Sequence, residues 1–215
     1  MRNDILQGLY GISDTILTPY ESLESQLKDA IKGGLKIFQL RDKTSDRNAL
    51  IEKIYRLSEL CAKKNVLFVL NDHIDLASRL KIQALHIGRN THTQTLDDMQ
   101  YLKYFSKARK QFSGILGASA YGDISLAKKL ENLGADYVAF GAIFPSITKP
   151  KAPCIGVEIL SQAKDILKIP ICAIGGISKE NINLLKIADM CALISDLWDK
   201  NPLLNAQIIL QKWRL

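Results

Sequence analysis

The chain has 215 residues, of which 47% are hydrophobic and 24% are charged, so it can bury a sizeable core as one α/β domain. Its 29 Lys and Arg against 22 Asp and Glu give a formal charge of +7. The basic residues are scattered, without a run of five and without interleaved aromatic residues, which argues against nucleic acid as a partner.

The sequence also argues against export and membrane insertion. No window approaches the roughly 18 uninterrupted apolar residues of a membrane span, and the first residues lack the apolar segment of an export signal. None of the four cysteines forms a C-x-x-C pair: Cys61, Cys154, Cys172 and Cys191. We therefore expect a cytoplasmic protein whose cysteines are reduced and buried.

Short apolar runs alternate with helix-length amphipathic segments along the chain. The predicted strands cover residues 9–12, 37–40, 66–70, 84–87, 115–119, 137–141, 171–174 and 192–195. The predicted helices cover residues 21–32, 47–64, 74–80, 96–105, 124–133, 157–167, 179–187 and 203–213. Eight β-then-α units without a composition break predict a single domain over residues 1–215, an eight-stranded parallel β/α (TIM) barrel. The competing doubly wound sheet usually has fewer strands and a G-x-G-x-x-G turn, which is absent.

In such a barrel the active site forms at the carboxyl ends of the strands, and polar residues follow nearly every predicted strand. Gln39, Arg41 and Lys43 lie two apart, so in an extended chain their side chains point to one side, and that of Asp42 points to the other. With Lys149, after the sixth strand, they could bind a diphosphate, because Arg grips oxygen atoms as a fork and Lys adds a compact charge. Other polar residues follow further strands: Asn71, Asp72, His86, Arg89, Ser119, Ser146, Thr148 and Ser195.

Two more sites are predicted at the same end of the barrel. Gly175 and Gly176 precede a predicted helix that Ser178 could cap, and their N–H groups could bind a phosphate together with the Ser195 hydroxyl. A simple tight turn is the alternative. Asp72 is interpreted as a Mg²⁺ ligand beside the diphosphate, and the alternative is that it caps the helix starting at residue 74. His86 is expected to be a packed or hydrogen-bonded barrel residue.

Five segments together resemble the thiamine phosphate synthase family, which includes thiazole tautomerase relatives. They are residues 39–43 (QLRDK), 71–77 (NDHIDLA), 134–137 (GADY), 140–149 (FGAIFPSITK) and 173–177 (AIGGI). The resemblance implies a transferase that joins hydroxymethylpyrimidine diphosphate to thiazole phosphate and releases diphosphate by a dissociative substitution. By the family pattern, the pyrimidine diphosphate is held by Gln39, Arg41, Lys43, Asn71, Ser119 and Lys149, with Asp72 on Mg²⁺. The thiazole phosphate is held by Ser146, Thr148, Gly175, Gly176, Ile194 and Ser195.

One segment departs from the family pattern. After the fourth strand the synthases read His-x-Gly-Gln-x-Asp, whereas residues 86–91 here read HIGRNT. Thr91 therefore stands where a second Mg²⁺ ligand is expected. Three interpretations remain open: Asp72, Asn90 and waters hold the metal; Arg89, a predicted substrate-binding residue, supplies charge where the metal would have helped; or the activity has weakened or changed.

Two alternatives to the synthase are a thiazole tautomerase-like isomerase and a catalytically silent barrel that binds a thiamine-pathway ligand. Tautomerase relatives carry a histidine two residues after the serine of the fifth strand, where this chain has Tyr121. The retained diphosphate-binding residues favour the synthase. In each case we expect small molecules as partners and expect no binding to nucleic acid or to a membrane. The sequence is compatible with a homo-oligomer.

Overall fold

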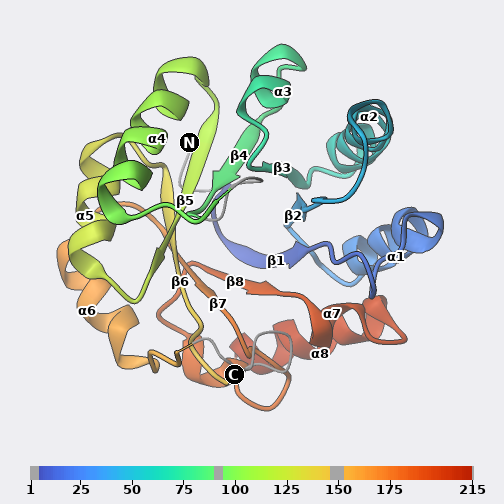
Figure 1. The fold of residues 1–215 in the computed structure, drawn as a ribbon. Coiled ribbons are helices and arrows are strands. Elements are labelled where there is room, and N and C mark those ends of the chain that lie inside the picture. Colours follow the sequence, from blue (N-terminus) through green and yellow to red (C-terminus); the bar gives the residue numbers. More distant parts are fainter. Residues whose placement is uncertain (1–4, 90–93, 146–152, 215) are drawn as a thin grey trace.

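The structure is a computed structural model that describes residues 5–89, 94–145 and 153–214. Its strands form a closed parallel barrel in which each strand pairs with the next along the chain and the eighth pairs with the first. Figure 1 looks along the barrel and shows the helices arranged around it. The predicted eight-stranded parallel β/α barrel is therefore confirmed.

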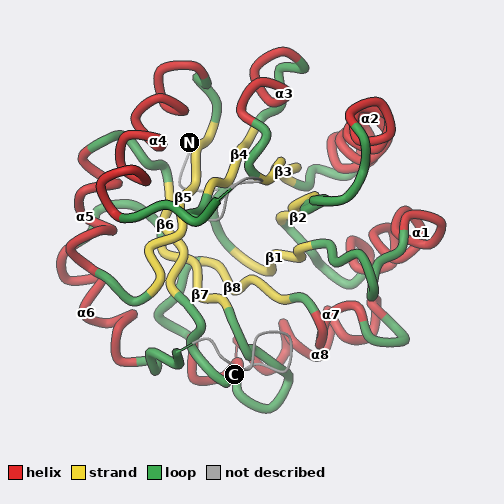
Figure 2. The backbone as a smooth tube through the Cα atoms, viewed as in Figure 1, coloured by secondary structure: helices red, strands yellow, loops and turns green. Residues whose placement is uncertain are grey.

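The element bounds follow the predicted order (Figure 2). The strands are β1 (Gly8–Ile12), β2 (Ile37–Leu40), β3 (Leu67–Asn71), β4 (Ala84–Ile87), β5 (Ile115–Tyr121), β6 (Tyr137–Phe140), β7 (Ile171–Ile174) and β8 (Met190–Leu193). The helices are α1 (Tyr20–Lys32), α2 (Arg47–Lys63), α3 (Ile74–Arg79), α4 (Asp98–Gln111), α5 (Ile124–Asn132), α6 (Glu158–Ile166), the 3₁₀-helix η1 (Ile182–Leu185), α7 (Ser195–Trp198) and α8 (Pro202–Arg214). Within the described ranges, no helix has both the length and the apolar character needed to cross a bilayer.

The predicted helix over residues 179–187 is wrong, because only η1 forms there. Asn181 accepts a hydrogen bond from the backbone N–H of Ser178 at 2.9 Å and donates one to the carbonyl of Gly176 at 2.9 Å. Such local side-chain bonds offer the backbone an alternative to a helix. The Ser178 hydroxyl accepts from the N–H of Glu180 within this turn and caps no α-helix.

Two other elements differ from expectation. The strand predicted to reach residue 195 ends at Leu193, and Ser195 instead begins the unpredicted helix α7. The helix predicted over residues 96–105 is displaced to α4, because Asp97 and Gln100 form a capping box that fixes its start.

Apolar side chains fill two layers, one inside the barrel and one between the barrel and the helices. Tyr10 of β1 and Tyr137 of β6 lie in the inner layer and are buried. Gly117 of β5 leaves room for the Tyr137 ring, because a Cβ at that position would lie 2.0 Å from it. Three cysteines are buried as expected, but Cys154 is exposed, since it lies in the loop before α6 and not in a strand.

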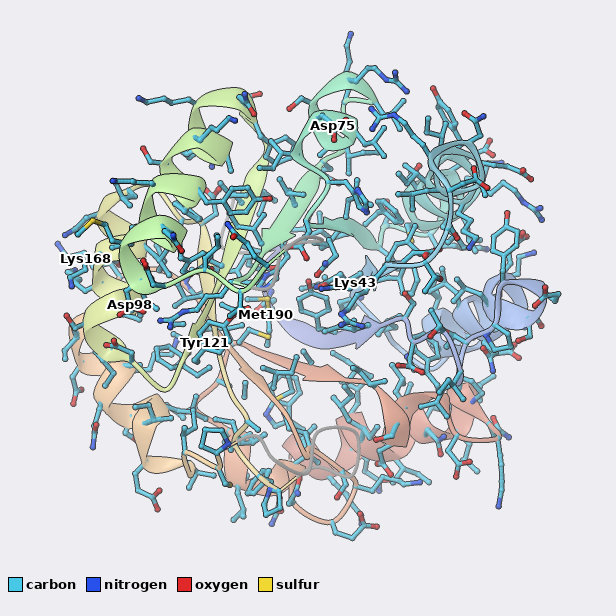
Figure 3. The ribbon with its side chains drawn as sticks, viewed as in Figure 1. Lys43, Asp75, Asp98, Tyr121, Lys168 and Met190 are labelled. Atoms are coloured by element: carbon cyan, nitrogen blue, oxygen red, sulfur yellow. The ribbon has the colours of Figure 1, made fainter. Side chains whose placement is uncertain are left out.

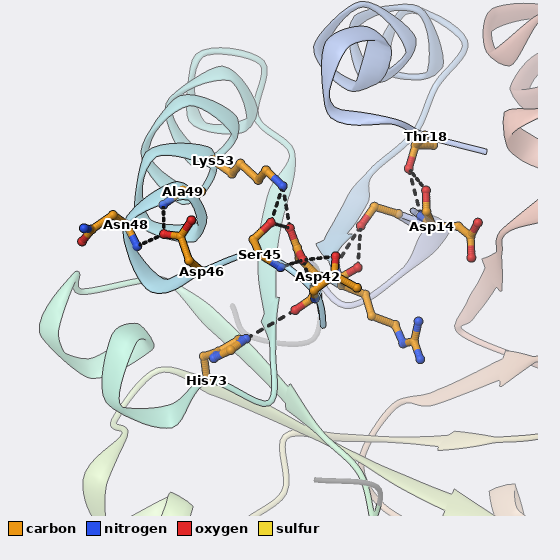
Figure 4. Close-up of polar contacts among 12 residues, drawn as sticks. Asp14, Thr18, Asp42, Ser45, Asp46, Asn48, Ala49, Lys53 and His73 are labelled. Atoms are coloured by element: carbon orange, nitrogen blue, oxygen red, sulfur yellow. Dashed lines mark hydrogen bonds and ion pairs between the residues drawn. The ribbon is translucent and has the colours of Figure 1, made fainter. Parts of the chain in front are cut away.

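Asp42 follows β2 and its side chain faces the helix layer, on the side opposite to that predicted for Arg41. Its carboxylate accepts from Lys53 Nζ of α2 at 2.7 Å and from Ser45 Oγ at 2.6 Å, and two backbone N–H groups complete the site (Figure 4). Burial alone would raise the pKa of Asp42, but the bonds from Lys53 and Ser45 hold it well below its usual range. This ion pair joins the end of β2 to α2 and so fixes the loop that carries Arg41 and Lys43.

We expect Asp42→Asn to lower the free energy of unfolding by about 3 kcal/mol at pH 7, because the largely buried Lys53 ammonium loses its carboxylate partner and keeps only the neutral Ser45 hydroxyl as a hydrogen-bond acceptor. The folded pKa of Asp42 is depressed, so its stabilisation is complete above the unfolded pKa of about 3.9 and is lost as the pH falls further. The difference between the two proteins should therefore narrow below about pH 4. Urea unfolding at several pH values measures this, with Glu59→Gln, which breaks an exposed pair with Lys63, as the control. A difference that does not change with pH would contradict the assignment.

Candidate active site

A cavity of about 180 Å³ lies at the carboxyl end of the barrel. Predicted site residues from four consecutive strands or the loops after them line it: Gln39, Arg41, Lys43, Asn71, Asp72, His86 and Ser119. In Figure 3, Lys43 lies near the centre of the barrel, whereas Asp75 lies on the outer helix α3. The backbone N–H of Arg41 donates to Ser13 Oγ at 2.8 Å, which ties the end of β2 to the loop after β1. The cationic side chains predicted to meet here therefore do so, apart from Lys149, which lies outside the described residues.

Asp72 is the buried carboxylate of this cavity. Its Oδ2 accepts from Asn71 Nδ2 at 2.7 Å and lies 3.8 Å from Lys43 Nζ, while Oδ1 accepts from the N–H of Gly88 at 3.3 Å. The backbone of Asp72 has a φ of +63°, a left-handed conformation that is uncommon outside glycine and is often found at functional sites. The alternative role as a helix cap is wrong, because His73 occupies the N-cap of α3 and no side chain caps that helix.

A second cavity, of about 410 Å³, adjoins the first at the ends of β5 to β8. Gly175, Gly176, Ile194 and Ser195 line it, as the phosphate-site prediction requires. Both glycines have positive φ angles, +95° and +65°, and a Cβ on Gly176 would lie 2.3 Å from the carbonyl oxygen of Pro145. The backbone of this loop therefore comes closer to its neighbours than any side chain would allow.

Ser119 and Tyr121 line both cavities and so lie where the two meet. Tyr121 Oη accepts from the backbone N–H of Arg89 at 2.9 Å, and burial raises the pKa of its hydroxyl. The Arg89 guanidinium forms an ion pair with Asp98 at 2.5 Å and stacks over the Tyr121 ring at 4.9 Å. Arg89 lines neither cavity in this arrangement, so its predicted contact with substrate has no support from the geometry.

His86 is buried in the barrel, as expected, and both of its ring nitrogens have partners. Nδ1 lies 3.0 Å from the Tyr137 hydroxyl and Nε2 lies 3.0 Å from Ser119 Oγ. Burial lowers the pKa of His86 to about 4, which keeps the ring neutral at physiological pH. Neither Tyr10 nor Tyr137 is among the predicted site residues, although a hydroxyl-bearing ring inside an apolar strand is itself a signal of a buried hydrogen bond.

The described residues could hold Mg²⁺ only if a bound substrate supplied further oxygen ligands. No group of three His, Cys, Asp or Glu side chains suited to a metal occurs in the described part of the chain. Mg²⁺ is commonly held by one or two carboxylates plus phosphate oxygens and water. Asp72, beside the cationic residues that suit a diphosphate, offers one such carboxylate. Asn90, the other ligand considered, and Thr91, which stands in place of the second carboxylate, lie outside the described residues. The predicted substrate-binding residues Ser146, Thr148 and Lys149 also lie outside them.

Comparisons with known proteins agree with this arrangement. A family model described as thiamine monophosphate synthase matches residues 9–197. The thiamine-phosphate synthase of Wolinella succinogenes is 41% identical over 220 residues, covering 100% of this chain and 97% of the relative. That of Halorhodospira halophila is 33% identical over 214 residues, covering 97% and 95%. Among solved structures, a thiamine phosphate pyrophosphorylase from Pyrococcus furiosus matches with a TM-score of 0.82 at 26% identity, covering 99% of this chain and 97% of that one.

Proposed function

The chain belongs to the thiamine monophosphate synthase family, and from that premise we propose that it joins hydroxymethylpyrimidine diphosphate to thiazole phosphate and releases diphosphate. One observation carries the proposal beyond the family. A cavity lined by Arg41 and Lys43 adjoins a cavity lined by Gly175 and Gly176, and Ser119 lies at their junction. Two phosphate-bearing substrates would thus meet at one point.

In the smaller cavity, Arg41 and Lys43 would bind the diphosphate of the pyrimidine substrate. The bond between the pyrimidine methylene carbon and the diphosphate oxygen breaks first, and the negative charge on the leaving group grows as it does so. Fixed cations that stabilise this growing charge lower the barrier. The thiazole nitrogen then bonds to the methylene carbon, which gives thiamine phosphate. No step needs a strong base, in keeping with the neutral, buried His86.

Asp72 would supply the protein carboxylate for Mg²⁺, with the diphosphate oxygens and water as the other ligands. When bound, the metal adds positive charge beside the leaving group. Lys43, 3.8 Å from the Asp72 carboxylate, supplies charge at the same place. The positive charge of Lys43 beside Asp72 is one reason why a single metal-binding carboxylate could be enough, although Thr91 stands in place of the second one.

In the larger cavity, the N–H groups of the Gly175-Gly176 turn and the Ser195 hydroxyl would bind the thiazole phosphate. Asp196 of α7 accepts from the backbone N–H of Lys179 at 2.7 Å and thereby links the two loops that form this end of the site. Roles for Ser146, Thr148 and Lys149 in binding remain predictions from the sequence.

No feature of the described residues favours the isomerase or the silent barrel. Tyr121 occupies the position of the tautomerase histidine, but its hydroxyl accepts from the Arg89 backbone and burial raises its pKa. It is therefore a poor base near neutral pH.

The purified protein, given both substrates and Mg²⁺, should form thiamine phosphate and release diphosphate in equal amounts. We expect Lys43→Gln to lower turnover about a hundredfold, because it removes a fixed charge next to the leaving group. Lys63→Gln, on the exposed face of α2, is the control. Absence of product where a reference synthase works would overturn the proposal. Interconversion of thiazole tautomers without pyrimidine would indicate the isomerase, and binding without turnover would indicate the silent barrel.

A further inference from the structure

A continuous chain of hydrogen bonds crosses the inside of the barrel just below the site. Gln39 Nε2 donates to the Tyr10 hydroxyl at 2.7 Å, and the hydroxyls of Tyr10 and Tyr137 are 3.1 Å apart. The Tyr137 hydroxyl lies 3.0 Å from His86 Nδ1, and His86 Nε2 lies 3.0 Å from Ser119 Oγ. Each of the five residues comes from a different strand, and all except Ser119 are buried.

With Gln39 Nε2 as the donor of the first bond, the direction of the other bonds follows, because the hydrogen of each buried hydroxyl then has one acceptor left among the described residues. The Gln39 amide nitrogen only donates, so the Tyr10 hydroxyl accepts there and has its own hydrogen left for Tyr137. Tyr137 in turn donates to Nδ1 of His86. A neutral imidazole has one donor and one acceptor nitrogen, so Nε2 carries the hydrogen and donates to Ser119 Oγ.

We infer that His86 is a positioning residue that transmits this direction across the barrel and leaves the Ser119 hydroxyl as a hydrogen-bond donor to the ligand. In the part of the chain that the structure describes, His86 is the one hydrogen-bond partner of the Ser119 side chain. Its hydroxyl oxygen accepts from His86, so its hydrogen is left for a group in the cavities that Ser119 lines.

This inference rests on the proposed function and explains how the hydrogen-bond chain would favour the 4-aminopyrimidine ring that the proposed substrate already carries. The two ends of the chain line the smaller cavity with opposite characters, the Gln39 carbonyl oxygen as an acceptor and the Ser119 hydroxyl as a donor. A 4-aminopyrimidine carries an amine donor and ring-nitrogen acceptors, so it complements both ends. A 4-oxopyrimidine presents an oxygen acceptor where the amine was and is mismatched with Gln39. The hydrogen-bond chain would thus favour binding of the 4-amino ring over the 4-oxo ring.

The tautomer of His86 is the direct test, and it needs no substrate. Long-range ¹H–¹⁵N correlation spectra at pH 7 should show one histidine with a protonated Nε2 and an unprotonated Nδ1. The protein has 3 histidines, and the signal that is lost in His86→Gln is the signal of His86. If Nδ1 carries the hydrogen instead, the donor and acceptor of every bond in this hydrogen-bond chain are exchanged and the Gln39 amide is reversed. That result would overturn the inference even if the protein forms thiamine phosphate. Failure of the synthase assay would leave the tautomer result unchanged.

Tyr137→Phe tests the consequence for binding, because it removes the donor to His86 Nδ1 and leaves the tautomer unfixed. The wild-type protein should bind the 4-amino pyrimidine diphosphate about tenfold or more tightly than its 4-oxo analogue, since the latter leaves a polar group unpaired. In Tyr137→Phe this preference should fall below about threefold, with mixed tautomers in the spectra. Tyr101→Phe is the matched control, because its buried hydroxyl bonds to the backbone of Ile87 and Ser119 but to no side chain of the hydrogen-bond chain, so the tautomer of His86 should stay fixed. An unchanged preference in Tyr137→Phe, or an equal loss in Tyr101→Phe, would overturn the inference.

Discussion

Replacing Asp72 with asparagine is expected to lower the turnover of the synthase reaction about a hundredfold or more while leaving the fold intact. The substitution removes the buried negative charge that lies 3.8 Å from Lys43 Nζ, and of the two carboxylates that line the cavity, Asp14 and Asp72, it removes the buried one. Loss of this charge weakens Mg²⁺ binding. The measurement is turnover as a function of Mg²⁺ concentration, in which the variant should need more metal and reach a lower maximum.

The fold should tolerate this change for two reasons. Asparagine adopts left-handed backbone angles more readily than most residues, so the φ of +63° at position 72 adds no strain. The amide oxygen can still accept from the N–H of Gly88, and the new amide nitrogen can donate to the side-chain oxygen of Asn71 once the Asn71 amide reverses. We therefore expect the melting temperature of Asp72→Asn to stay close to that of the wild type, whereas alanine at this position would mix backbone strain with the loss of charge.

Asp75→Asn is the matched control for this experiment. Asp75 lies three residues further on, in α3, where its side chain is 60% exposed and pairs with Arg47 on the surface. Exposed pairs contribute about 0–1 kcal/mol, and this one lies outside both cavities, so turnover should not change. If Asp72→Asn has full turnover with an unchanged Mg²⁺ response, Asp72 only orders the loop and the metal assignment fails.

The positions of the site residues could be predicted because they depend on local rules. Alternation along an extended chain places Gln39, Arg41 and Lys43 on one side, and the repeating β-then-α pattern brings the strand ends together. The same rules place Asp42 toward the helix layer, where Lys53 holds it. Local patterns thus predict that Gln39, Arg41 and Lys43 line the smaller cavity, but they do not predict that Arg89 lines neither cavity.

Contacts between distant segments could not be predicted in this way. The hydroxyls of Tyr10 and Tyr137 meet although 127 positions separate the two residues, and no local pattern pairs them. The helix expected over residues 179–187 failed for a related reason. Its apolar spacing suits a helix, but Asn181 bonds to Ser178 and Gly176 and holds the chain in a turn. Whether such a side chain bonds to its own backbone depends on the loops packed around it.

The thiazole phosphate half of the site should respond to a different substitution. We expect Gly176→Ala to lower kcat/KM for thiazole phosphate about a hundredfold, because shifting a binding loop by about 1 Å has effects of this size. A Cβ at position 176 would lie 2.3 Å from the carbonyl oxygen of Pro145 and 2.5 Å from that of Phe144, so the backbone must move. Affinity for the pyrimidine diphosphate, measured alone by calorimetry, should change little, since Gly176 does not line the smaller cavity.

Gly134→Ala separates this local effect from a general loss of stability. Gly134 follows α5, has a φ of +93°, and lines neither cavity, so alanine there incurs a comparable backbone penalty of about 1–2 kcal/mol away from the site. Both variants should therefore melt at lower temperatures, but only Gly176→Ala should lose activity toward thiazole phosphate at a temperature where both are folded. Equal kinetic losses would mean that position 176 acts through stability alone. A loss of pyrimidine diphosphate affinity in Gly176→Ala would instead mean that the two cavities do not divide the substrates between them, because Asp72 and Gly176 would then serve the same ligand.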